Sequence, residues 1–515
     1  MKILSWHFGH DGSLTYSNNN KLVFHTQLDR FNGYKHNGVI SKSLINKLSN
    51  LNVDLFIVTY VVHNSWVDRA IDYLKHRKVI NSDTKIKIIG RDHHHIFHAF
   101  CVKYLSKFKE GGVWVSDGSG ALVKDRYLEA VSGYTFDNNN LKEKYKYYYD
   151  SEIPNKVPIQ VGMMYSKLVS SFKMKPHFDE NKIMAFSEYG KETKNIQTFI
   201  NKDNNINTNL FNDYNGNLPI PNVRELYTDN LDEFAKDVAY RVQKDFEYKY
   251  YTDVREFVQK NNIKNLCLSG GCSMNILNNT YLKKELNVNI FIDPLCNDQG
   301  ISLGVNVLAN IENTNKDLEP VDDVFLGLEV EYDLNIFKGY DIVDYNDSKV
   351  AKLLNDGHVI GLFQGRSEQG QRGLGNRSLL AHPNYEGILD KVNKIKKREW
   401  YRPFACSVLD DQKEKYFNCD FKSPYMLYVF DGKHKLKNIA SITNKSRIQT
   451  VDKGMRFYDI INEFFKLSKI PYVLNTSLNI PGDPLVENMA DLKYMLDNTD
   501  LKYVYLPDIN KLITK

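Results

Sequence analysis

The histidine-rich stretch at residues 91–98, Arg-Asp-His-His-His-Ile-Phe-His, constrains the fold of this chain more than any other feature. An apolar, β-prone run at residues 84–90 precedes it, so the histidines follow a predicted strand and open a predicted helix. In a helix, His94 and His98 are one turn apart on the same face, where two imidazoles can bind one metal ion. The alternative is a histidine-rich helix start at the surface, or a His98 that packs in the core.

Two aspartates are candidates for further ligands. Asp117 follows the apolar run 113–116 and precedes a glycine. The end of a strand is a usual place for a carboxylate that belongs to a functional site. Asp298 lies in the loop 294–304, where it is a fourth ligand or a contact to a ribose or to metal-bound water. Imidazole and carboxylate ligands suit iron, manganese or zinc, and the pattern does not choose among them.

Length, charge and cysteine content narrow the class of protein. A chain of 515 residues is expected to form more than one domain. The net charge of +5 is small, without a lysine- or arginine-rich tail, which argues against nucleic-acid binding. The six cysteines are scattered without a C-x-x-C pair, which argues against a zinc ribbon or a disulfide framework. Without a signal peptide or an apolar run of about 18 residues, a cytoplasmic protein with no membrane span is expected.

The N-terminus begins with a predicted strand at residues 3–6, a polar turn at 7–13 and a hairpin at 14–27. Actin-like ATPase folds begin in this way, with the turn facing phosphate or substrate. His10 and Asp11 in the turn are a candidate catalytic pair, because histidine can act as a base near neutral pH and a carboxylate can orient it. The alternative is that both side chains bond only to the backbone of the turn.

Four longer segments are predicted from their patterns. Residues 53–61 form a strand, and the lysine- and tyrosine-rich residues 141–150 form the solvated face of a helix. Residues 191–217 form an asparagine-rich surface insertion, and residues 230–260 form a long amphipathic helix.

A glycine pair follows the short predicted strand 265–268. Gly270 and Gly271 lie between this strand and helix-forming sequence. Such a turn lets backbone amides and a helix N-terminus approach a ligand.

A second unit is predicted after the polar residues 312–323, which are typical of a linker. Its densest part, residues 361–378, contains three arginines, five glycines and three glutamines, which fits neither a core strand nor an ordinary helix. Arginines are bidentate donors to phosphate, and glycines let the backbone come close. Residues 396–404 add further cations. We therefore predict a pocket for phosphate or a small carbonyl anion, since the alternative of a solvated basic loop would not need the glycines.

Several motifs together resemble one family, the O-carbamoyltransferases of the NodU/CmcH type, over nearly the full chain. The strongest match is residues 364–378, which fit Q-G-R-x-E-x-G-x-R-A-L-G-N-R-S. Residues 94–99 fit H-H-x-x-H-A, and residues 10–13 fit the N-terminal H-D-S-S/A turn. Further matches are residues 28–36, 182–190, 269–275, 396–399, 402–405, 447–449 and 475–477.

The chain departs from the family pattern at four positions. Asp29 replaces the usual glutamate, Gly373 an alanine, Leu478 a phenylalanine and Cys406 a proline. None of these changes removes a proposed ligand or catalytic group. The asparagine-rich insertion has no family counterpart that we can assign.

The resemblance implies an α/β protein of two domains. Residues 1–325 would form an actin-like (ribonuclease-H-type, ASKHA) domain with the metal, nucleotide and acceptor sites. Residues 326–515 would form a YrdC-like α/β domain that activates carbamoyl phosphate. The implied reaction has two steps, formation of carbamoyl-adenylate from carbamoyl phosphate and ATP, and transfer of the carbamoyl group to an acceptor hydroxyl. Mg(II) would accompany ATP, and Fe(II) is the expected metal ion, with Mn(II) or Zn(II) as alternatives.

The matched motifs also imply roles for individual residues. The metal ligands would be His94, His98, Asp117 and Asp298. The nucleotide would be seated by Gly270, Gly271 and Asn275, and the catalytic residues would be His10, the base for the acceptor hydroxyl, with Lys396 and Arg398. The expected pocket for carbamoyl phosphate and ATP consists of Arg366, Arg372, Arg377, Lys396, Arg398, Arg447, Asn475 and Ser477.

Other functions are weighed against this one. An actin-like sugar or glycerol kinase would share the N-terminal strand, turn and hairpin, but would not need the histidine pair or the arginine-rich segment. An inactive binding scaffold would be expected to lose His10, His94, His98 or Lys396, which are all present. Carbamoyl chemistry on tRNA is disfavoured by the small net charge. The acceptor is left open as a sugar, a natural product or a nucleoside or nucleotide hydroxyl, and a homodimer is expected by family analogy.

Overall fold

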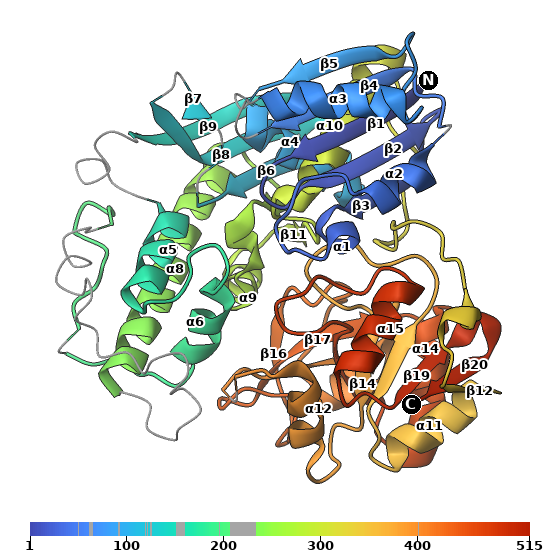
Figure 1. The fold of residues 1–515 in the computed structure, drawn as a ribbon. Coiled ribbons are helices and arrows are strands. Elements are labelled where there is room, and N and C mark those ends of the chain that lie inside the picture. The colour runs from blue at the N-terminus through green and yellow to red at the C-terminus, as the bar shows by residue number, and fades with distance from the viewer. Residues whose placement is uncertain are drawn as a thin grey trace. The chain divides into compact units, whose positions relative to one another are not determined.

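Figure 1 shows the computed structural model, which describes residues 1–515 except residues 50, 61–64, 91–92, 119, 121, 124–125, 151–159, 195, 207–232 and 400. The chain forms two compact units, one of residues 1–32 and 36–323 and one of residues 33–35 and 324–515. The division predicted from the sequence lies between residues 325 and 326. Residues 91–92 of the histidine-rich stretch and residues 207–217 of the predicted insertion lie outside the described residues.

The first unit contains a five-stranded sheet in the order β3-β2-β1-β4-β5. Its strands are β1 (Lys2–Phe8), β2 (Ser13–Asn18), β3 (Lys21–Gln27), β4 (Leu55–Tyr60) and β5 (Lys85–Ile89). β1, β2 and β3 are antiparallel, whereas β1, β4 and β5 are parallel. The hairpin turns at Asn19 and Asn20, both at positive φ, which asparagine tolerates. The predicted strand, turn and hairpin of an actin-like N-terminus are confirmed.

A second, six-stranded sheet has the order β11-β10-β6-β8-β7, and β9 pairs with β8. Its strands are β6 (Glu110–Ser116), β7 (Leu122–Val123), β8 (Tyr127–Asp137), β9 (Asn140–Asp150), β10 (Asn265–Ser269) and β11 (Asn289–Ile292). β6, β10 and β11 are parallel, so the segments that follow β6 and β10 leave the same edge of the sheet.

The helix predicted for residues 141–150 is wrong, because these residues belong to strand β9. β9 pairs antiparallel with β8 from one end to the other. The ring of Tyr145, which is 37% exposed, stacks on Trp114 with 5.1 Å between centroids, and Lys144 is also exposed. Lysine and tyrosine alternate at residues 144–147, which is the period-2 pattern of a strand, and tyrosine favours strands.

Helix α4 (His94–Ser106) packs between the second sheet, helix α10 (Ile301–Thr314) and the first sheet (Figure 1). Ala99 and Val102 contact the apolar side chains of β6, whereas Phe97 joins α10 and the first sheet. At Gly304 the two helices meet backbone to backbone, because a Cβ added there would lie 1.9 Å from the Phe97 carbonyl oxygen. α4 is therefore held on several sides.

The remaining helices of the first unit lie around these layers. They are α1 (Asp29–Asn32), α2 (Lys42–Leu48), α3 (Ser65–His76), α5 (Val161–Ser171), α6 (Glu180–Ser187), α8 (Glu233–Lys260) and α9 (Ile276–Glu285). α8 confirms the helix predicted for residues 230–260 from Glu233 onward; residues 230–232 lie outside the described part of the chain. None of the described helices combines the length and the apolar character that a membrane span needs.

The second unit is built on a nine-stranded sheet in the order β12-β20-β19-β13-β14-β18-β15-β17-β16. Its strands are β12 (Asp341–Asp344), β13 (Ile360–Phe363), β14 (Arg377–Ala381), β15 (Ala405–Leu409), β16 (Val429–Asp431), β17 (Lys445–Val451), β18 (Tyr472–Ser477), β19 (Tyr503–Leu506) and β20 (Lys511–Thr514). Its helices are α11 (Asp347–Asn355), α12 (Ile388–Lys396), α13 (Lys413–Tyr416), α14 (Arg456–Ser468) and α15 (Met489–Asn498).

The core of the second unit lies under α11 and α14. Leu354 of α11 and Phe464 of α14 pack with Leu362 of β13 and Val473 of β18. Most of the predicted anion-pocket segment, residues 364–376, connects β13 to β14. Both units are of the predicted α/β class, and the first agrees with the predicted actin-like domain. The YrdC-like character of the second unit stays a prediction.

Gly304→Ala should destabilise the first unit, although alanine is normally the better helix former by about 1 kcal/mol. The new methyl group would overlap the Phe97 carbonyl, and overpacking of this kind costs about 1–3 kcal/mol. Chemical denaturation followed by circular dichroism measures the change. Gly90→Ala is the control, because its Cβ would meet only the Tyr60 hydroxyl, at 3.7 Å. Equal stabilities of the two variants would contradict the close contact of α4 and α10.

Candidate metal centre and anion site

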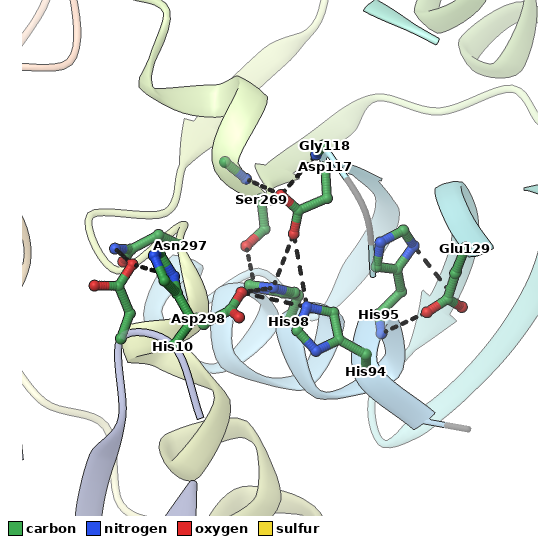
Figure 2. Close-up of polar contacts among 12 residues, drawn as sticks. His10, His94, His95, His98, Asp117, Gly118, Glu129, Ser269, Asn297 and Asp298 are labelled. Atoms are coloured by element: carbon green, nitrogen blue, oxygen red, sulfur yellow. Dashed lines mark hydrogen bonds and ion pairs between the residues drawn. The ribbon is translucent and has the colours of Figure 1, made fainter. Parts of the chain in front are cut away.

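The first turns of α4 carry both predicted histidine ligands. His94 and His98 are 8% and 0% exposed, which excludes a surface role for them. The backbone N–H of His95 donates to Glu129 Oε2 at 3.2 Å, and His95 Nδ1 lies 2.7 Å from Ser132 Oγ. Because Glu129 and Ser132 belong to β8, these contacts anchor the start of α4 on the second sheet. Figure 2 shows the contact of His95 with Glu129.

Asp117 and Asp298 form a cluster with the two histidines (Figure 2). Asp117 follows β6, and Asp298 opens a short 3-10 helix that leads into α10. His94 Nε2 lies 3.3 Å from Asp298 Oδ1 and 3.6 Å from Asp117 Oδ2. His98 Nε2 lies 3.6 Å from each of the same oxygens. The structure thus brings together all four predicted ligands, with one ligand atom of each within 4.8 Å of the others.

The spacing of these donors fits a divalent transition-metal ion. Ligand atoms bound at about 2.1 Å are about 3.0 Å apart at a right angle and about 3.4 Å apart at the tetrahedral angle. The nitrogen–oxygen distances of 3.3 to 3.6 Å are close to these values. His94 Nε2 and His98 Nε2 are also buried without a hydrogen-bond partner among the described residues. Imidazole and carboxylate donors suit iron, manganese or zinc.

The electrostatics of the cluster favour a positive charge. Burial lowers the pKa of His94, but Asp298 and Asp117 outweigh it and raise that pKa well above its usual value. Burial raises the pKa of Asp298, but His94 and His98 outweigh it and hold that pKa well below its usual value. A bound metal ion would balance the negative charge of the two aspartates. Without the ion, a protonated imidazole balances that charge.

Further contacts orient the ligands. Asp117 Oδ1 accepts hydrogen bonds from the Gly118 N–H at 2.9 Å and from the Gly271 N–H at 3.3 Å. His98 Nδ1 lies 3.4 Å from Ser269 Oγ, whose hydroxyl donates to a buried aspartate, Asp293, at 2.8 Å. Burial raises the pKa of that aspartate to about 6. Such outer contacts fix the orientation of metal ligands and tune their basicity.

The glycine turn after β10 lies beside the same cluster. Gly270 has a φ of +85°, and a Cβ there would lie 2.2 Å from a carbonyl oxygen at the end of β6, so only glycine fits. The Gly271 amide bonds Asp117, as described above. Asn275 caps α9 and exchanges two amide hydrogen bonds with Gln243. Nucleotide binding by Gly270, Gly271 and Asn275 stays a prediction.

The turn between β1 and β2 holds a second group of titratable side chains. Asp11 Oδ1 lies 2.6 Å from His36 Nδ1, and Asp11 Oδ2 lies 3.3 Å from His10 Nδ1. Asn297, the residue before Asp298, donates to Asp11 Oδ2 at 2.8 Å. Burial lowers the pKa of His10, but Asp11 outweighs it and raises that pKa. The sequence analysis assigns no role to His36, although the matched residues 28–36 include it.

His7 is a second histidine without a role in the sequence analysis, which places it in the turn. It belongs to β1 and is 2% exposed. Its Nδ1 lies 3.0 Å from Thr59 Oγ1, and its Nε2 lies 4.0 Å from Asp298 Oδ2. Burial lowers the pKa of His7 to about 4, so its imidazole is neutral near pH 7.

Five cationic side chains of the second unit lie within electrostatic reach of one another: Arg372, Lys396, Arg398, Arg402 and Arg447. Burial lowers the pKa of Arg447 well below its usual value, and the neighbouring guanidinium groups lower it further. The pKa values of Arg398 and Lys396 are lowered well below their usual values by burial and then by neighbouring cations. Glu399 Oε2 pairs with Arg402 Nη1 at 2.8 Å. Like charges that are close together and partly buried are costly, so this cationic cluster favours a multiply charged anion such as phosphate.

Four further predicted pocket residues make bonds within the protein, as Lys396 and Arg398 of the cluster also do. Arg377 is fully buried and donates to the backbone carbonyl of Gln364 at 2.6 Å. Arg366 donates to the backbone carbonyl of Leu326 at 3.0 Å. These bonds shape the arginine-rich segment itself.

The other two are Asn475 and Ser477 of β18. Asn475 Nδ2 donates to Ser407 Oγ at 2.8 Å, and the backbone carbonyl of Ser477 accepts from Lys396 Nζ at 2.8 Å. A direct role of these residues in substrate binding stays a prediction. Arg402 is the residue of the cationic cluster that the sequence analysis leaves out, although it lies in the matched residues 402–405.

Comparison with known proteins agrees with this architecture. The family described as carbamoyltransferase N-terminus matches residues 61–307, and the family described as carbamoyltransferase C-terminus matches residues 351–513. The chain is 26% identical to nodulation protein NolNO of Sinorhizobium fredii, over 96% of this chain and 78% of that protein. It is 28% identical to an uncharacterized protein of Methanocaldococcus jannaschii, over 94% of each chain. It is 31% identical to nodulation protein U of Azorhizobium caulinodans, over 45% of this chain and 42% of that protein.

The two family matches cover both units, and they occur in the same order as the two domains predicted from the sequence motifs. The chain therefore belongs to the carbamoyltransferase family, and it is an enzyme that transfers a carbamoyl group.

Proposed function

We propose that this enzyme is an ATP-dependent O-carbamoyltransferase that forms carbamoyl-adenylate in residues 326–515 and transfers the carbamoyl group in residues 1–325. The observation that carries the proposal is the cationic cluster of Arg372, Lys396, Arg398, Arg402 and Arg447, in which Lys396 is buried and the four arginines are half-buried. Carbamate is a poor electrophile, so its activation as a mixed anhydride is the chemical reason for using ATP.

The activation step uses two phosphate-containing donors, carbamoyl phosphate and ATP, and releases phosphate and pyrophosphate. Water takes the phosphate from carbamoyl phosphate, and a carbamate oxygen then attacks the α-phosphorus of ATP while pyrophosphate leaves. Both donors and both leaving groups are anions. Guanidinium groups held in place before the reaction stabilise this charge as it develops on the phosphate oxygens. Mg(II) would accompany ATP.

In the transfer step, the acceptor hydroxyl attacks the carbamoyl carbon and AMP leaves. His10 is the candidate base for the hydroxyl proton, and Asp11 lies 3.3 Å from its Nδ1, where it can orient the ring. A divalent ion held by His94, His98, Asp117 and Asp298 would polarise the carbonyl or bind the phosphate of the adenylate. Gly270, Gly271 and Asn275 remain the candidates for the nucleotide site.

The acceptor is a hydroxyl of a sugar, a natural product or a nucleoside or nucleotide. The names of two of the three relatives described above mention nodulation, and none of the three names an acceptor. Fe(II) is our first choice for the ion, with Mn(II) or Zn(II) next. A homodimer in the cytoplasm is the expected state of the enzyme.

Purified protein with ATP, Mg(II) and carbamoyl phosphate should release pyrophosphate, and Arg447→Met should slow this release by about 100- to 1,000-fold. The substitution removes one cation from a crowded cluster, so the variant should fold at least as well. Lys435→Met is the control, because Lys435 is exposed in the same unit. Pyrophosphate release that does not need carbamoyl phosphate, or that Arg447→Met leaves unchanged, would contradict the proposed activation site.

His94→Ala should abolish metal binding and carbamoyl transfer while pyrophosphate release continues. Metal content is measured by mass spectrometry after loading with Fe(II) or Mn(II), and transfer is measured with pools of sugars and nucleotides. His76→Ala, an exposed histidine of α3, is the control. An equal loss of both half-reactions would contradict the division of labour between the two domains.

Asp11→Asn should move the acid limb of the transfer rate to lower pH. Asp11 raises the pKa of His10, so in the unmodified enzyme the base loses its proton only at a pH above its usual pKa. Without the carboxylate charge, His10 becomes neutral at lower pH. The measurement is the transfer rate against pH with an acceptor pool that supports transfer. If the acid limb stays in place, His10 is not the base, or Asp11 does not set its pKa.

A further inference from the structure

We propose that His7 is a further ligand of the metal centre and binds the ion through Nε2, beside His94, His98, Asp117 and Asp298. The inference rests on the proposed metal centre and adds a third imidazole to it. No sequence motif of the chain assigns His7 this role.

One side of the His7 ring is held by the neighbouring strand. His7 pairs with Thr59 in the parallel register of β1 and β4, and its Nδ1 lies 3.0 Å from Thr59 Oγ1. If Nδ1–H donates to this hydroxyl, the lone pair of the ring is on Nε2. A hydrogen bond to one ring nitrogen is the usual way in which a protein fixes the other nitrogen for a metal.

The other side of the ring faces the metal centre. His7 Nε2 is buried and has no hydrogen-bond partner among the described residues. It lies 4.0 Å from Asp298 Oδ2, which is too far for a hydrogen bond. The other oxygen, Asp298 Oδ1, lies 3.3 Å from His94 Nε2, and the His7 and His94 rings are 6.4 Å apart between centroids.

The distance between His7 Nε2 and Asp298 Oδ2 is one that a shared ion permits. Two ligand atoms bound at about 2.1 Å are between about 3.0 and 4.2 Å apart, from adjacent to opposite positions. The 4.0 Å distance between His7 Nε2 and Asp298 Oδ2 lies within this range, so one ion can bridge these two atoms. His7 is not in the group of four residues whose ligand atoms all lie within 4.8 Å of one another, so its ring has to shift toward that group when the ion binds. An orphaned ring nitrogen that faces a carboxylate in the core is costly unless a ligand satisfies it. The resulting set of three imidazoles and two carboxylates selects a transition metal over Mg(II) or Ca(II).

His25 is a matched control within the same sheet. It is also buried, and its Nδ1 lies 2.8 Å from a threonine hydroxyl, Thr15 Oγ1. The charged neighbour that acts on it is the cation Arg30, so its surroundings do not favour a metal ion. Comparing the two histidines separates metal binding from the general cost of replacing a buried histidine.

The test uses Co(II) as the probe, because its visible spectrum reports the number and the type of ligands. His7→Gln should weaken Co(II) binding by about 100-fold in competition with a chelator and should change the visible bands. Thr59→Val, which removes only the hydroxyl, should weaken binding by about 10-fold. His25→Gln should leave both the affinity and the bands unchanged.

A folded His7→Gln protein with unchanged affinity and an unchanged Co(II) spectrum would overturn the proposal. X-ray absorption at the cobalt edge of the unmodified protein is a second measurement, which does not depend on the folding of a variant. Three coordinated imidazoles would support the proposal, and two would overturn it. If the unmodified protein binds no Co(II), the metal centre itself fails, which is a different result from the failure of His7 alone.

Discussion

The packing of α4 is the contact on which the first unit depends. One face of the helix contacts the second sheet, Phe97 joins the core of the first sheet, and Gly304 brings α10 into backbone contact. His94 and His98 lie at the start of α4, and Asp298 lies just before α10. A shift of either helix would therefore move ligands that must stay within about 0.5 Å of their working positions. The geometry of the candidate metal centre is thus set by apolar packing as much as by its polar contacts.

The two candidate sites have opposite imbalances of charge. Asp117 and Asp298 lie beside the imidazoles of His94 and His98. The negative charge of these carboxylates is balanced when an imidazole is protonated or when a metal ion binds. The cationic cluster gathers four guanidinium groups and Lys396, and Glu399 is the carboxylate paired with it. Each imbalance lowers the stability of the protein without its ligand, and each is reduced when the ligand binds. The sign of the imbalance therefore indicates whether a cation or an anion fits the candidate site of each unit.

Much of the fold and of the metal centre was predictable from local patterns. His94 and His98 follow from helical spacing and Asp117 from a carboxylate at a strand end, which are short-range features. Asp298 lies in a loop, and only the resemblance to the family decided that it joins the other three. The role of His7 depends on the pairing of β1 with β4, about 50 residues away, and no local pattern shows it. Arg377 and Arg402 are the same residue type in matched motifs, but only the folded chain shows that Arg377 bonds backbone carbonyls. Strand β9 was missed because its tyrosines alternate with lysines and resemble a polar helix face.

The candidate metal ligands come from segments that are up to about 200 residues apart along the chain, near residues 94, 117 and 298. An unfolded chain cannot hold them together, so an ion that binds them stabilises the folded state by mass action. At a free-ion concentration 1,000 times the dissociation constant, this linkage amounts to about 4 kcal/mol, which is comparable to the whole stability of many domains. The amount of folded enzyme in a cell would then follow the supply of the ion, so that metal scarcity would reduce the amount of this enzyme as well as its activity.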